Sequence, residues 1–270
     1  MKFSRETELA INAAKQAGEA ILKIYNTKFD TQFKLDQEPI TRADTDSEKI
    51  IRQILQESGL PILSEERADD LERLKSNKVW IVDPLDGTSD FVERTGEFSV
   101  MIGLVDSHVP VAGIIYQPVG EVLYAAEKGR GAYQCKDGTW AKLSVSLVGE
   151  MSQARAIMSK HHLSAEDKEI LEKLGVHSYV QHGSAGLKAV AVAKGEAELY
   201  FTSTDKIKQW DTCAAYCLVT EAGGRMTDML GSPLVYNTEK VNHEYGVLIS
   251  NGNFTDQLAA IYRKLNEQSI

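Results

Sequence analysis

The segment from Trp80 to Thr88 constrains the fold more strongly than any other part of the chain. It opens with an apolar run of the kind found in buried strands, which would carry Asp83 to the carboxyl end of the strand. Pro84 fixes the backbone for a turn, after which Asp86 can face the same point as Asp83. Two carboxylates that converge repel each other unless a positive charge lies between them. The spacing therefore favours a cation at the end of this strand.

A divalent metal ion is the simplest occupant of that point. Hard cations such as Mg²⁺ prefer oxygen ligands, and the carbonyl of Leu85 lies between the two carboxylates in the sequence. If a helix begins after Gly87, the N–H groups of Thr88 and Ser89 would be free to bind a phosphate group. A plain Asx-turn with no metal is the alternative.

The composition is that of a folded protein, and it limits the partners. The 270 residues include 43% hydrophobic side chains, enough to bury a large core as one domain or two. The net charge is −9, so a nucleic-acid polymer is not an expected partner, because phosphate backbones need clustered Lys and Arg. A small phosphorylated ligand is compatible with this charge, since a local basic pocket can form on an acidic protein.

The cysteines and the apolar runs predict a cytoplasmic protein without a membrane span. Three cysteines are too few for a disulfide framework, and no apolar run follows the first charged residues as it would in a secretion signal. The longest apolar run, residues 100–105, is far too short to cross a bilayer.

Helical spacing predicts two helices at the start of the chain. Apolar residues recur at helical intervals over residues 9–24. Thr45 and Glu48 have the spacing of a capping box, so we expect a second helix to begin there and to end at Gly59.

The rest of the chain divides into a strand-rich part and an alternating part. Three β-type runs predict an antiparallel meander over 99–105, 111–116 and 122–126, with a loop over 127–138. Further strands are expected at 62–63, 79–82, 156–158, 199–201 and 247–249, and further helices at 164–174, 185–194, 211–221 and 254–266. A boundary near 145–153 would separate an α+β domain (1–150) from an α/β domain (151–270).

Other acidic residues stand at similar transitions between elements. Asp44 precedes the second predicted helix, Glu65 follows a short β-type run, and Asp211 begins a helix. Taken one at a time, they are explained as a turn residue, a solvated strand end and a helix cap. Their occurrence together favours a functional explanation.

Together these segments resemble the inositol monophosphatase superfamily of metal-dependent, lithium-sensitive phosphatases. The matching stretches follow the family's order: Thr41–Asp44, Leu63–Glu66, Asp83–Thr88, Gly183–Ser184 and Trp210–Gly224. The resemblance implies a five-layered α-β-α-β-α sandwich. Its N-terminal domain would carry most of the metal ligands, and its C-terminal domain would carry Asp211 and the substrate-side residues.

The resemblance also implies the catalytic machinery. Two or three Mg²⁺ ions would be held by Glu65, Asp83, the Leu85 carbonyl, Asp86 and Asp211. They would neutralise the phosphate ester, activate a water molecule and steady the leaving alkoxide. Thr88, oriented by Asp44, would accept the proton of that water, which Glu65 positions. The N–H groups of Gly87, Thr88 and Ser89 would hold the phosphate in line.

The substrate end of the site resembles one branch of the superfamily. The segment Gly183–Lys188 is similar to the Gly-Ser-x-Gly-Leu-Lys segment of 3′(2′),5′-bisphosphate nucleotidases, and the acidic Asp90 departs from the Asn of the inositol branch. A second phosphate needs a second anion site, which Lys188, Lys206 and Lys208 could form. The expected substrate-binding residues here are Gly183, Ser184, the three lysines and Asp211. The implied reaction is hydrolysis of 3′-phosphoadenosine 5′-phosphate to AMP and phosphate.

Two alternatives stay open. An inositol-1-phosphate or fructose-1,6-bisphosphate phosphatase would use the same metal site on a polyol or sugar phosphate. A non-catalytic divalent-metal or nucleotide-binding protein would carry the constellation for structural reasons only. Among the remaining features, we interpret Cys213 and Cys217 as core cysteines, His161–His162 as exposed, and Gly129–Gly131 as a turn.

Overall fold

The computed structural model describes residues 2–33 and 39–267 of the chain. Two long helices and a short hairpin precede a large sheet in the first half. The elements of this half are α1 (Arg5–Tyr25), β1 (Thr31–Phe33), β2 (Pro39–Thr41), α2 (Arg42–Leu55), β3 (Ile62–Ser64), β4 (Lys78–Asp86), α3 (Thr88–Glu93), β5 (Ser99–Asp106), β6 (Val109–Gln117), β7 (Val122–Glu127), β8 (Gly131–Lys136) and β9 (Thr139–Lys142).

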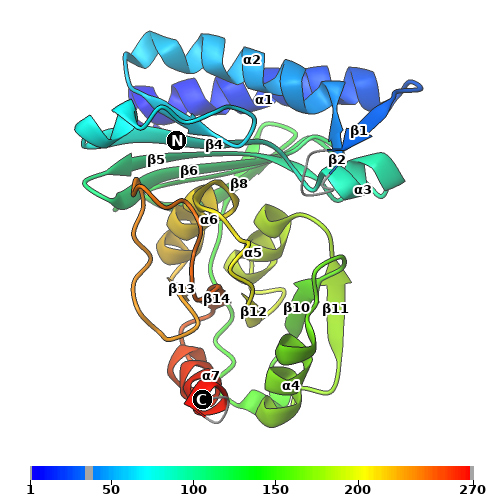
Figure 1. Cartoon of the computed structure of the whole chain (residues 1–270), viewed down its shortest axis with the longest axis vertical. Helices are drawn as coiled ribbons and strands as arrows, with labels where there is room; N and C mark the ends of the chain where they lie inside the picture. Colours follow the sequence, from blue (N-terminus) through cyan, green and yellow to red (C-terminus); the bar gives the residue numbers. More distant parts are fainter. Residues whose placement is uncertain (1, 34–38, 268–270) are drawn as a thin grey trace.

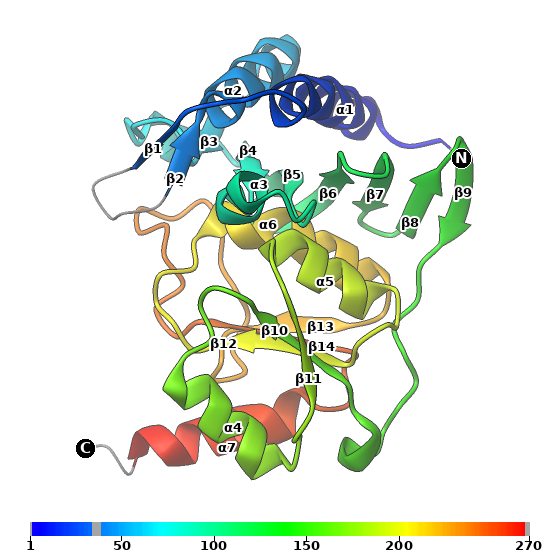
Figure 2. The ribbon, with the colours of Figure 1, turned by 90° about the vertical axis from the view of Figure 1, so that its right-hand side faces the viewer.

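A seven-stranded sheet forms the centre of the first half, with strand order β3-β4-β5-β6-β7-β8-β9. β3 and β4 are parallel, and every later neighbouring pair is antiparallel. α1 and α2 lie side by side over one face (Figures 1 and 2), where their buried apolar residues share a core with Trp80 and Val82 of β4. α2 packs on β4, whereas the apolar stripe that predicted the first helix packs on β5 and β6.

The predicted start of α2 is wrong by one helical turn. The capping box uses Thr41 and Asp44, because the Thr41 side chain accepts the Ala43 N–H and the Asp44 carboxylate accepts the Thr41 N–H at 2.7 Å. Thr41 ends the extended strand β2, so the chain is already in the conformation that a cap requires. Glu48 instead accepts a hydrogen bond of 2.6 Å from Ser64 at the end of β3.

The meander of β5, β6 and β7 is confirmed, but the loop predicted over residues 127–138 is wrong. The chain turns at Gly129–Gly131, as expected, and then continues as β8 and β9. Only Ala132 and Cys135 of β8 are buried, and the other four residues of this strand are partly or fully exposed. Its apolar content is therefore too low for the pattern to stand out from a loop.

The second half builds a smaller sheet with four further helices. Its elements are β10 (Ala156–Ser159), α4 (Ala165–Leu174), β11 (Tyr179–His182), α5 (Ala185–Ala193), β12 (Leu199–Thr202), α6 (Gln209–Glu221), β13 (Arg225–Thr227), β14 (Val247–Ser250) and α7 (Thr255–Glu267). The strand order is β11-β10-β12-β14-β13; β10 is parallel to β11 and β12, and β14 is antiparallel to both of its neighbours.

The two sheets and three pairs of helices stack in five layers. α5 and α6 fill the space between the sheets, and α4 and α7 cover the outer face of the smaller sheet (Figure 2). The predicted α-β-α-β-α sandwich is confirmed. The predicted domain boundary lies in the connection between β9 and β10, and the α5–α6 layer shares one core with both sheets. The division into two domains stays a prediction.

α6 packs unusually closely on the large sheet, which brings Asp211 near β4. A Cβ atom on Gly103 of β5 would overlap the Cys213 sulfur, and one on Gly113 of β6 would overlap the Ala214 carbonyl. Cys213 and Cys217 are both buried and free, as the sequence predicts. Among residues 2–33 and 39–267, no helix combines the length and apolar character needed to cross a membrane.

Candidate active site and metal centre

β4 ends in an irregular turn that carries three potential metal ligands. Its pairing with β5 is regular as far as Asp83 and shifts before Asp86, so the strand bulges between the two carboxylates. The Asp83 carboxylate accepts the Leu85 N–H at 3.0 Å, and the Pro84 carbonyl accepts the Ser47 hydroxyl of α2 at 2.7 Å. These hydrogen bonds hold the turn in one conformation.

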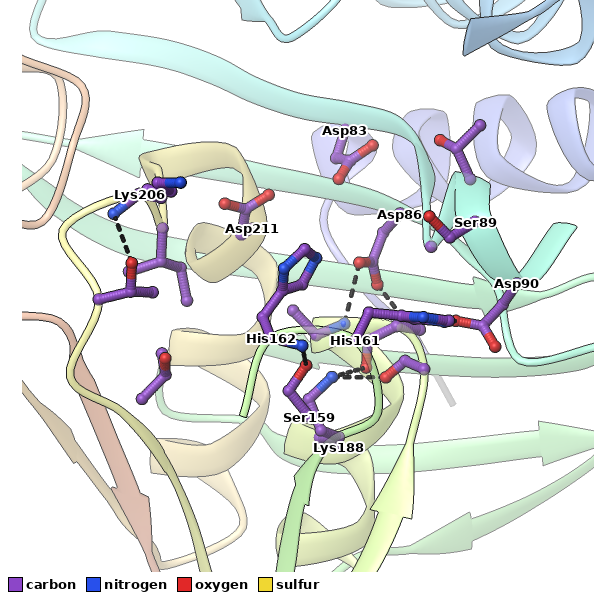
Figure 3. A pocket seen from close by; sticks show the side chains of 18 of the residues that line it. Asp83, Asp86, Ser89, Asp90, Ser159, His161, His162, Lys188, Lys206 and Asp211 are labelled. Carbon is purple, nitrogen blue, oxygen red and sulfur yellow. Dashed lines mark hydrogen bonds and ion pairs between the residues drawn. The ribbon is translucent and has the colours of Figure 1, made fainter. Parts of the chain in front are cut away.

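Asp83, Asp211 and Glu65 form an acidic cluster with Asp86. Asp83 is only 2% exposed, and burial together with the charges of Glu65, Asp86 and Asp211 raises its pKa well above the usual range. Burial and the charge of Glu65 likewise raise the pKa of Asp211. Figure 3 shows the carboxylates of Asp83, Asp86 and Asp211 facing a common space. With the Leu85 carbonyl they form an all-oxygen donor set, so the residues present fit a hard divalent cation.

Asp86 connects this cluster to the start of α5. One carboxylate oxygen, Oδ2, accepts the Ser99 hydroxyl at 3.0 Å, the Gly186 N–H at 2.9 Å and the Ser184 hydroxyl. The other, Oδ1, accepts the Ala185 N–H at 2.9 Å. A carboxylate oxygen has two lone pairs, so Oδ1 retains the capacity to bind a cation. The predicted residues Gly183 and Ser184 therefore lie at the site, with Ser184 bonded to Asp86.

Thr88 and Asp44 meet beside the turn. The Thr88 hydroxyl lies 3.0 Å from Asp44 Oδ1 and 3.1 Å from the Leu85 carbonyl oxygen. It has one proton, so it can donate to only one of these acceptors at a time. Asp44 Oδ2 is fixed by the Thr41 N–H at 2.7 Å and the Thr41 hydroxyl at 2.8 Å. Burial raises the pKa of Asp44, and the hydrogen bonds from Thr41 and Thr88 oppose that rise.

The acidic cluster forms one wall of a cleft of about 520 Å³. Gly87, Thr88 and Ser89 lie on the same side, at the start of α3. The far wall is formed by polar residues that end or follow β10 and β12: Ser159, His161, His162, Ser164, Thr202, Thr204 and Lys206. In Figure 3 the His162 ring is directed toward the space that Asp86 and Asp211 face. The cleft thus joins residues of both sheets.

The role of the histidine pair was missed by the sequence analysis. Both residues are exposed, as expected, but both line the cleft. They follow β10, which is parallel to its two neighbours in the smaller sheet. Ligands of open α/β sheets bind beyond the carboxyl ends of parallel strands, so the position of His161–His162 after the predicted strand was a usable signal.

Lys188 is occupied by backbone carbonyl groups. Its ammonium donates to the Ser184 carbonyl at 2.9 Å and to the Gly183 carbonyl, and it lies 5.0 Å from the centre of the Tyr200 ring. Burial lowers the pKa of Lys188 to about 8, although the charges of Asp86 and other acids oppose this. The side chain thus holds the loop before α5 through its carbonyl groups, and it also lines the cleft.

Lys206 and Lys208 lie in different environments. Lys206 lines the cleft. The Lys208 ammonium lies 5.2 Å from the centre of the Trp210 ring, and the Lys208 N–H donates to the Asp211 carboxylate at 2.7 Å. Of the three predicted lysines, Lys188 and Lys206 line the cleft, and Lys208 is not among its lining residues.

A second group of potential metal ligands lies at the edge of the cleft. Ligand atoms of Asp90, Glu93 and His161 lie within 4.8 Å of one another. The Lys160 ammonium is 3.2 Å from Asp90 and 3.5 Å from Glu93. Because this ammonium supplies positive charge to both carboxylates, the group is explained without a metal ion.

The five-layered fold and the acidic cleft together define a class, the metal-dependent phosphomonoesterases of the inositol monophosphatase type. Residues 3–267 match the model of the inositol monophosphatase family. The chain therefore belongs to the inositol monophosphatase family, whose members in general depend on Mg²⁺. The resemblance inferred from the sequence is confirmed.

Within this family, the chain is similar to proteins named CysQ. The 3′(2′),5′-bisphosphate nucleotidase CysQ of Escherichia coli (strain K12) is 37% identical over 83% of this chain and 90% of its own length. The crystal structure of CysQ from Bacteroides thetaiotaomicron has a TM-score of 0.81 and 33% identity, and the match covers 92% of this chain and 98% of that one. An inositol monophosphatase from Anabaena (Nostoc) sp. PCC 7120 has a TM-score of 0.76 and 25% identity, with coverage of 96% and 95%.

Proposed function

We propose that this chain hydrolyses 3′-phosphoadenosine 5′-phosphate to AMP and phosphate with the help of Mg²⁺. The observation that carries the proposal is the cleft itself. One wall is a cluster of carboxylates fit for divalent cations, and the opposite wall presents hydroxyl, imidazole and lysine side chains. A substrate with two anionic groups could contact both walls. The relative from Escherichia coli is named for activity on such bisphosphates, which supports the same substrate class.

The metal ligands of the proposal are carried by several elements. Two or three Mg²⁺ ions would be held by Glu65, Asp83, the Leu85 carbonyl, Asp86 and Asp211. Bound there, the ions would neutralise phosphate oxygens and lower the pKa of a water molecule. The chain itself keeps the ligands in place, since Asp83 is tied to its own turn and Asp86 to α5.

Proton transfer falls to Thr88 and Asp44. When the Leu85 carbonyl faces a cation, Asp44 Oδ1 is the remaining acceptor for the Thr88 hydroxyl, at 3.0 Å. The hydroxyl proton then points to Asp44, and an oxygen lone pair faces the cleft. Thr88 can in this way accept a hydrogen bond from the attacking water, and we assign Glu65 the role of positioning that water.

The substrate phosphates would contact two different parts of the site. The reacting phosphate would be held by the N–H groups of Gly87, Thr88 and Ser89, where the chain turns away from β4. The other phosphate would be held on the far wall, with Lys206 as a cation. Ser184 stays on the side of the acidic cluster, where it is bonded to Asp86. Lys188 contributes through the loop that it braces, and we assign Lys208 the same indirect role at Asp211.

An inositol-1-phosphate phosphatase is the second candidate, with fructose-1,6-bisphosphate as a related substrate. It is favoured by the similarity to the Anabaena inositol monophosphatase, which shares the whole fold. The acidic residue Asp90 at the cleft edge, together with the higher identity to CysQ, places the bisphosphate first. A cytoplasmic location remains a prediction from the sequence.

Phosphate release from a panel of substrates tests the proposal. The purified chain is assayed with and without Mg²⁺ on 3′-phosphoadenosine 5′-phosphate, inositol-1-phosphate and fructose-1,6-bisphosphate. We expect Mg²⁺-dependent release, fastest from the first. Asp83→Asn should abolish it in a folded protein, whereas the exposed Glu57→Gln should not change it. Faster turnover of inositol-1-phosphate would favour the second candidate, and no release from any ester would favour a non-catalytic binding protein.

A further inference from the structure

Asp90 is a buried carboxylate that lies at the edge of the cleft without belonging to the acidic cluster. It sits on α3, two residues after Thr88, and is 1% exposed. Its Oδ2 atom is 3.0 Å from His161 Nε2, and its Oδ1 atom is 3.2 Å from the Lys160 ammonium and 2.9 Å from the Thr95 hydroxyl. Two of these three partners belong to the loop after β10, which is part of the other sheet.

A third segment passes directly over the same carboxylate. A Cβ atom on Gly183 would overlap the Asp90 side chain, so the backbone before α5 lies against it. The Gly183 N–H donates to Glu97 at 2.8 Å, which holds this loop to the segment after α3. The next residue, Ser184, donates to Asp86. Asp90 is therefore where α3, the loop after β10 and the loop before α5 meet.

This meeting point sets the relation between the two walls of the cleft. α3 begins at Thr88, on the wall with the acidic cluster, whereas His161 lies on the far wall. The hydrogen bond to Asp90 fixes the His161 ring, and it places a proton on Nε2 whichever charge state the ring has. Charge-assisted hydrogen bonds of this kind orient side chains more strictly than neutral ones.

We propose that Asp90 is a positioning residue that determines substrate specificity. It holds His161 at the far wall and the neighbouring Lys160 beside it, so that the cleft accepts an ester with a second phosphate and discriminates against esters that lack it. This proposal rests on the proposed function, because it concerns how the same cleft selects its substrate. It also gives a physical role to the acid that stands before Phe91 in the sequence.

The charge of Asp90 makes the proposal testable in both directions. A negative charge near the cleft would by itself repel an anionic substrate, so removing it would improve binding. If Asp90 acts by holding two cationic or polar side chains in place, removing the charge weakens binding instead. The sign of the change in KM therefore separates the two explanations.

The experiment compares 3′-phosphoadenosine 5′-phosphate with adenosine 3′-phosphate, which lacks only the second phosphate. For Asp90→Asn we expect KM for the bisphosphate to rise about tenfold, the size of one lost orienting hydrogen bond, with kcat little changed. KM and kcat for adenosine 3′-phosphate should stay as in the wild type. Glu93→Gln is the matched control. It removes one negative charge from the same helix, at a residue that also contacts Lys160 but is half exposed. It should change neither substrate's KM more than about twofold.

A double-mutant cycle shows whether Asp90 acts through its partners. In a Lys160→Gln, His161→Ala background, Asp90→Asn should have no further effect on the KM of the bisphosphate. If Asp90→Asn does not fold, as judged by its melting curve, the same double variant takes its place, since both partners are at the surface. It should show the same selective rise in KM.

The outcomes separate the two proposals. A wild type that releases phosphate from neither nucleotide overturns the proposed function. A wild type that prefers the bisphosphate, combined with an Asp90→Asn variant in which both nucleotides are affected equally, overturns the specificity role and leaves the proposed function intact. An unchanged or lower KM for the bisphosphate in that variant overturns it as well.

Discussion

Removal of the Thr88 hydroxyl is the sharpest test of the catalytic geometry. Thr88→Val keeps the volume and the branched shape of the side chain but has no proton and no lone pair. The lost contacts are those to Asp44 at 3.0 Å and to the Leu85 carbonyl at 3.1 Å. Asp44 keeps both hydrogen bonds from Thr41, so the start of α2 remains capped. The variant therefore tests the hydroxyl group without disturbing the fold around it.

The expected loss in kcat follows from the role of the hydroxyl. A side chain that takes part in proton transfer contributes about a hundredfold to ten-thousandfold, so we expect kcat to fall about a thousandfold. That fall corresponds to about 4 kcal/mol in the activation barrier. Stability should fall by only about 1 kcal/mol, the value of one hydrogen bond, as measured by urea unfolding. Thr88→Ser retains the hydroxyl and should stay within about tenfold of the wild type.

Asp44→Asn tests whether the two residues act as one unit. An Asn amide that faced Thr88 would donate to it, and the Thr88 proton would turn to the Leu85 carbonyl. We expect a loss of the same order, and the double variant should be no slower than the slower single variant. Phosphate release at saturating Mg²⁺ and substrate measures all four variants. A Thr88→Val enzyme that keeps a third or more of the wild-type kcat would refute the assignment.

Three further predictions concern the scaffold of the site. His243 is buried against α6, where its Nε2 atom lies 2.8 Å from the Thr212 hydroxyl. Burial lowers the pKa of His243 to about 4 from 6.5, so the unfolded chain binds a proton that the folded chain does not, and stability is lost as the pH falls from 6.5 toward 4. At pH 5 the loss should reach about 2 kcal/mol in urea unfolding, and it should be absent in His243→Gln. Lys188→Met should destabilise the protein by about 1–3 kcal/mol, because the carbonyls before α5 lose their donor, whereas a side chain used only for binding would change KM alone. Gly103→Ala should destabilise the protein by about 1–3 kcal/mol, seen as a lower melting temperature, because its Cβ would push Cys213 and α6 away from the sheet. Phosphate release should fall in the same variant, since α6 carries Asp211.

The parts of the fold that follow from local patterns could be predicted from the sequence. The strands β5, β6 and β7 stand out as short continuous apolar runs, and α1 stands out by the helical spacing of its apolar residues. β11 could not be found in this way, because it is an edge strand whose residues are half-buried or exposed. Its sequence has no apolar face that would separate it from a loop.

The start of α2 shows a second limit. Thr41–Asp44 and Thr45–Glu48 are two possible caps, one helical turn apart, and both have suitable residues. The prediction from the sequence used only the later pair. Thr41 is the cap because it ends strand β2 in an extended conformation, and Glu48 is instead bound by Ser64 of β3. Neither the short strand β2 nor the hydrogen bond from Ser64 leaves a local signal in the sequence.

The metal side of the cleft was easier to predict than the substrate side, for a reason that lies in the chemistry. Several carboxylates at the ends of strands rarely stabilise a fold by themselves, so their joint occurrence indicates a cation site. A lysine has many uses, and the backbone carbonyls that occupy Lys188 cannot be seen in the sequence. The contact of His161 cannot be seen in the sequence either, because its partner Asp90 lies on α3, between two strands of the larger sheet.

Asp86 explains why the two sides of the cleft depend on each other. Its carboxylate is a potential metal ligand, and it is also the acceptor for the first N–H groups of α5 and for Ser184. The helix start that it fixes is preceded by Gly183, which lies against Asp90. A cation bound to Asp86 Oδ1 would therefore compete with the Ala185 N–H for that oxygen and affect the loop before α5. Because one carboxylate serves both purposes, a change that loosens the start of α5 should weaken metal binding and substrate selection together.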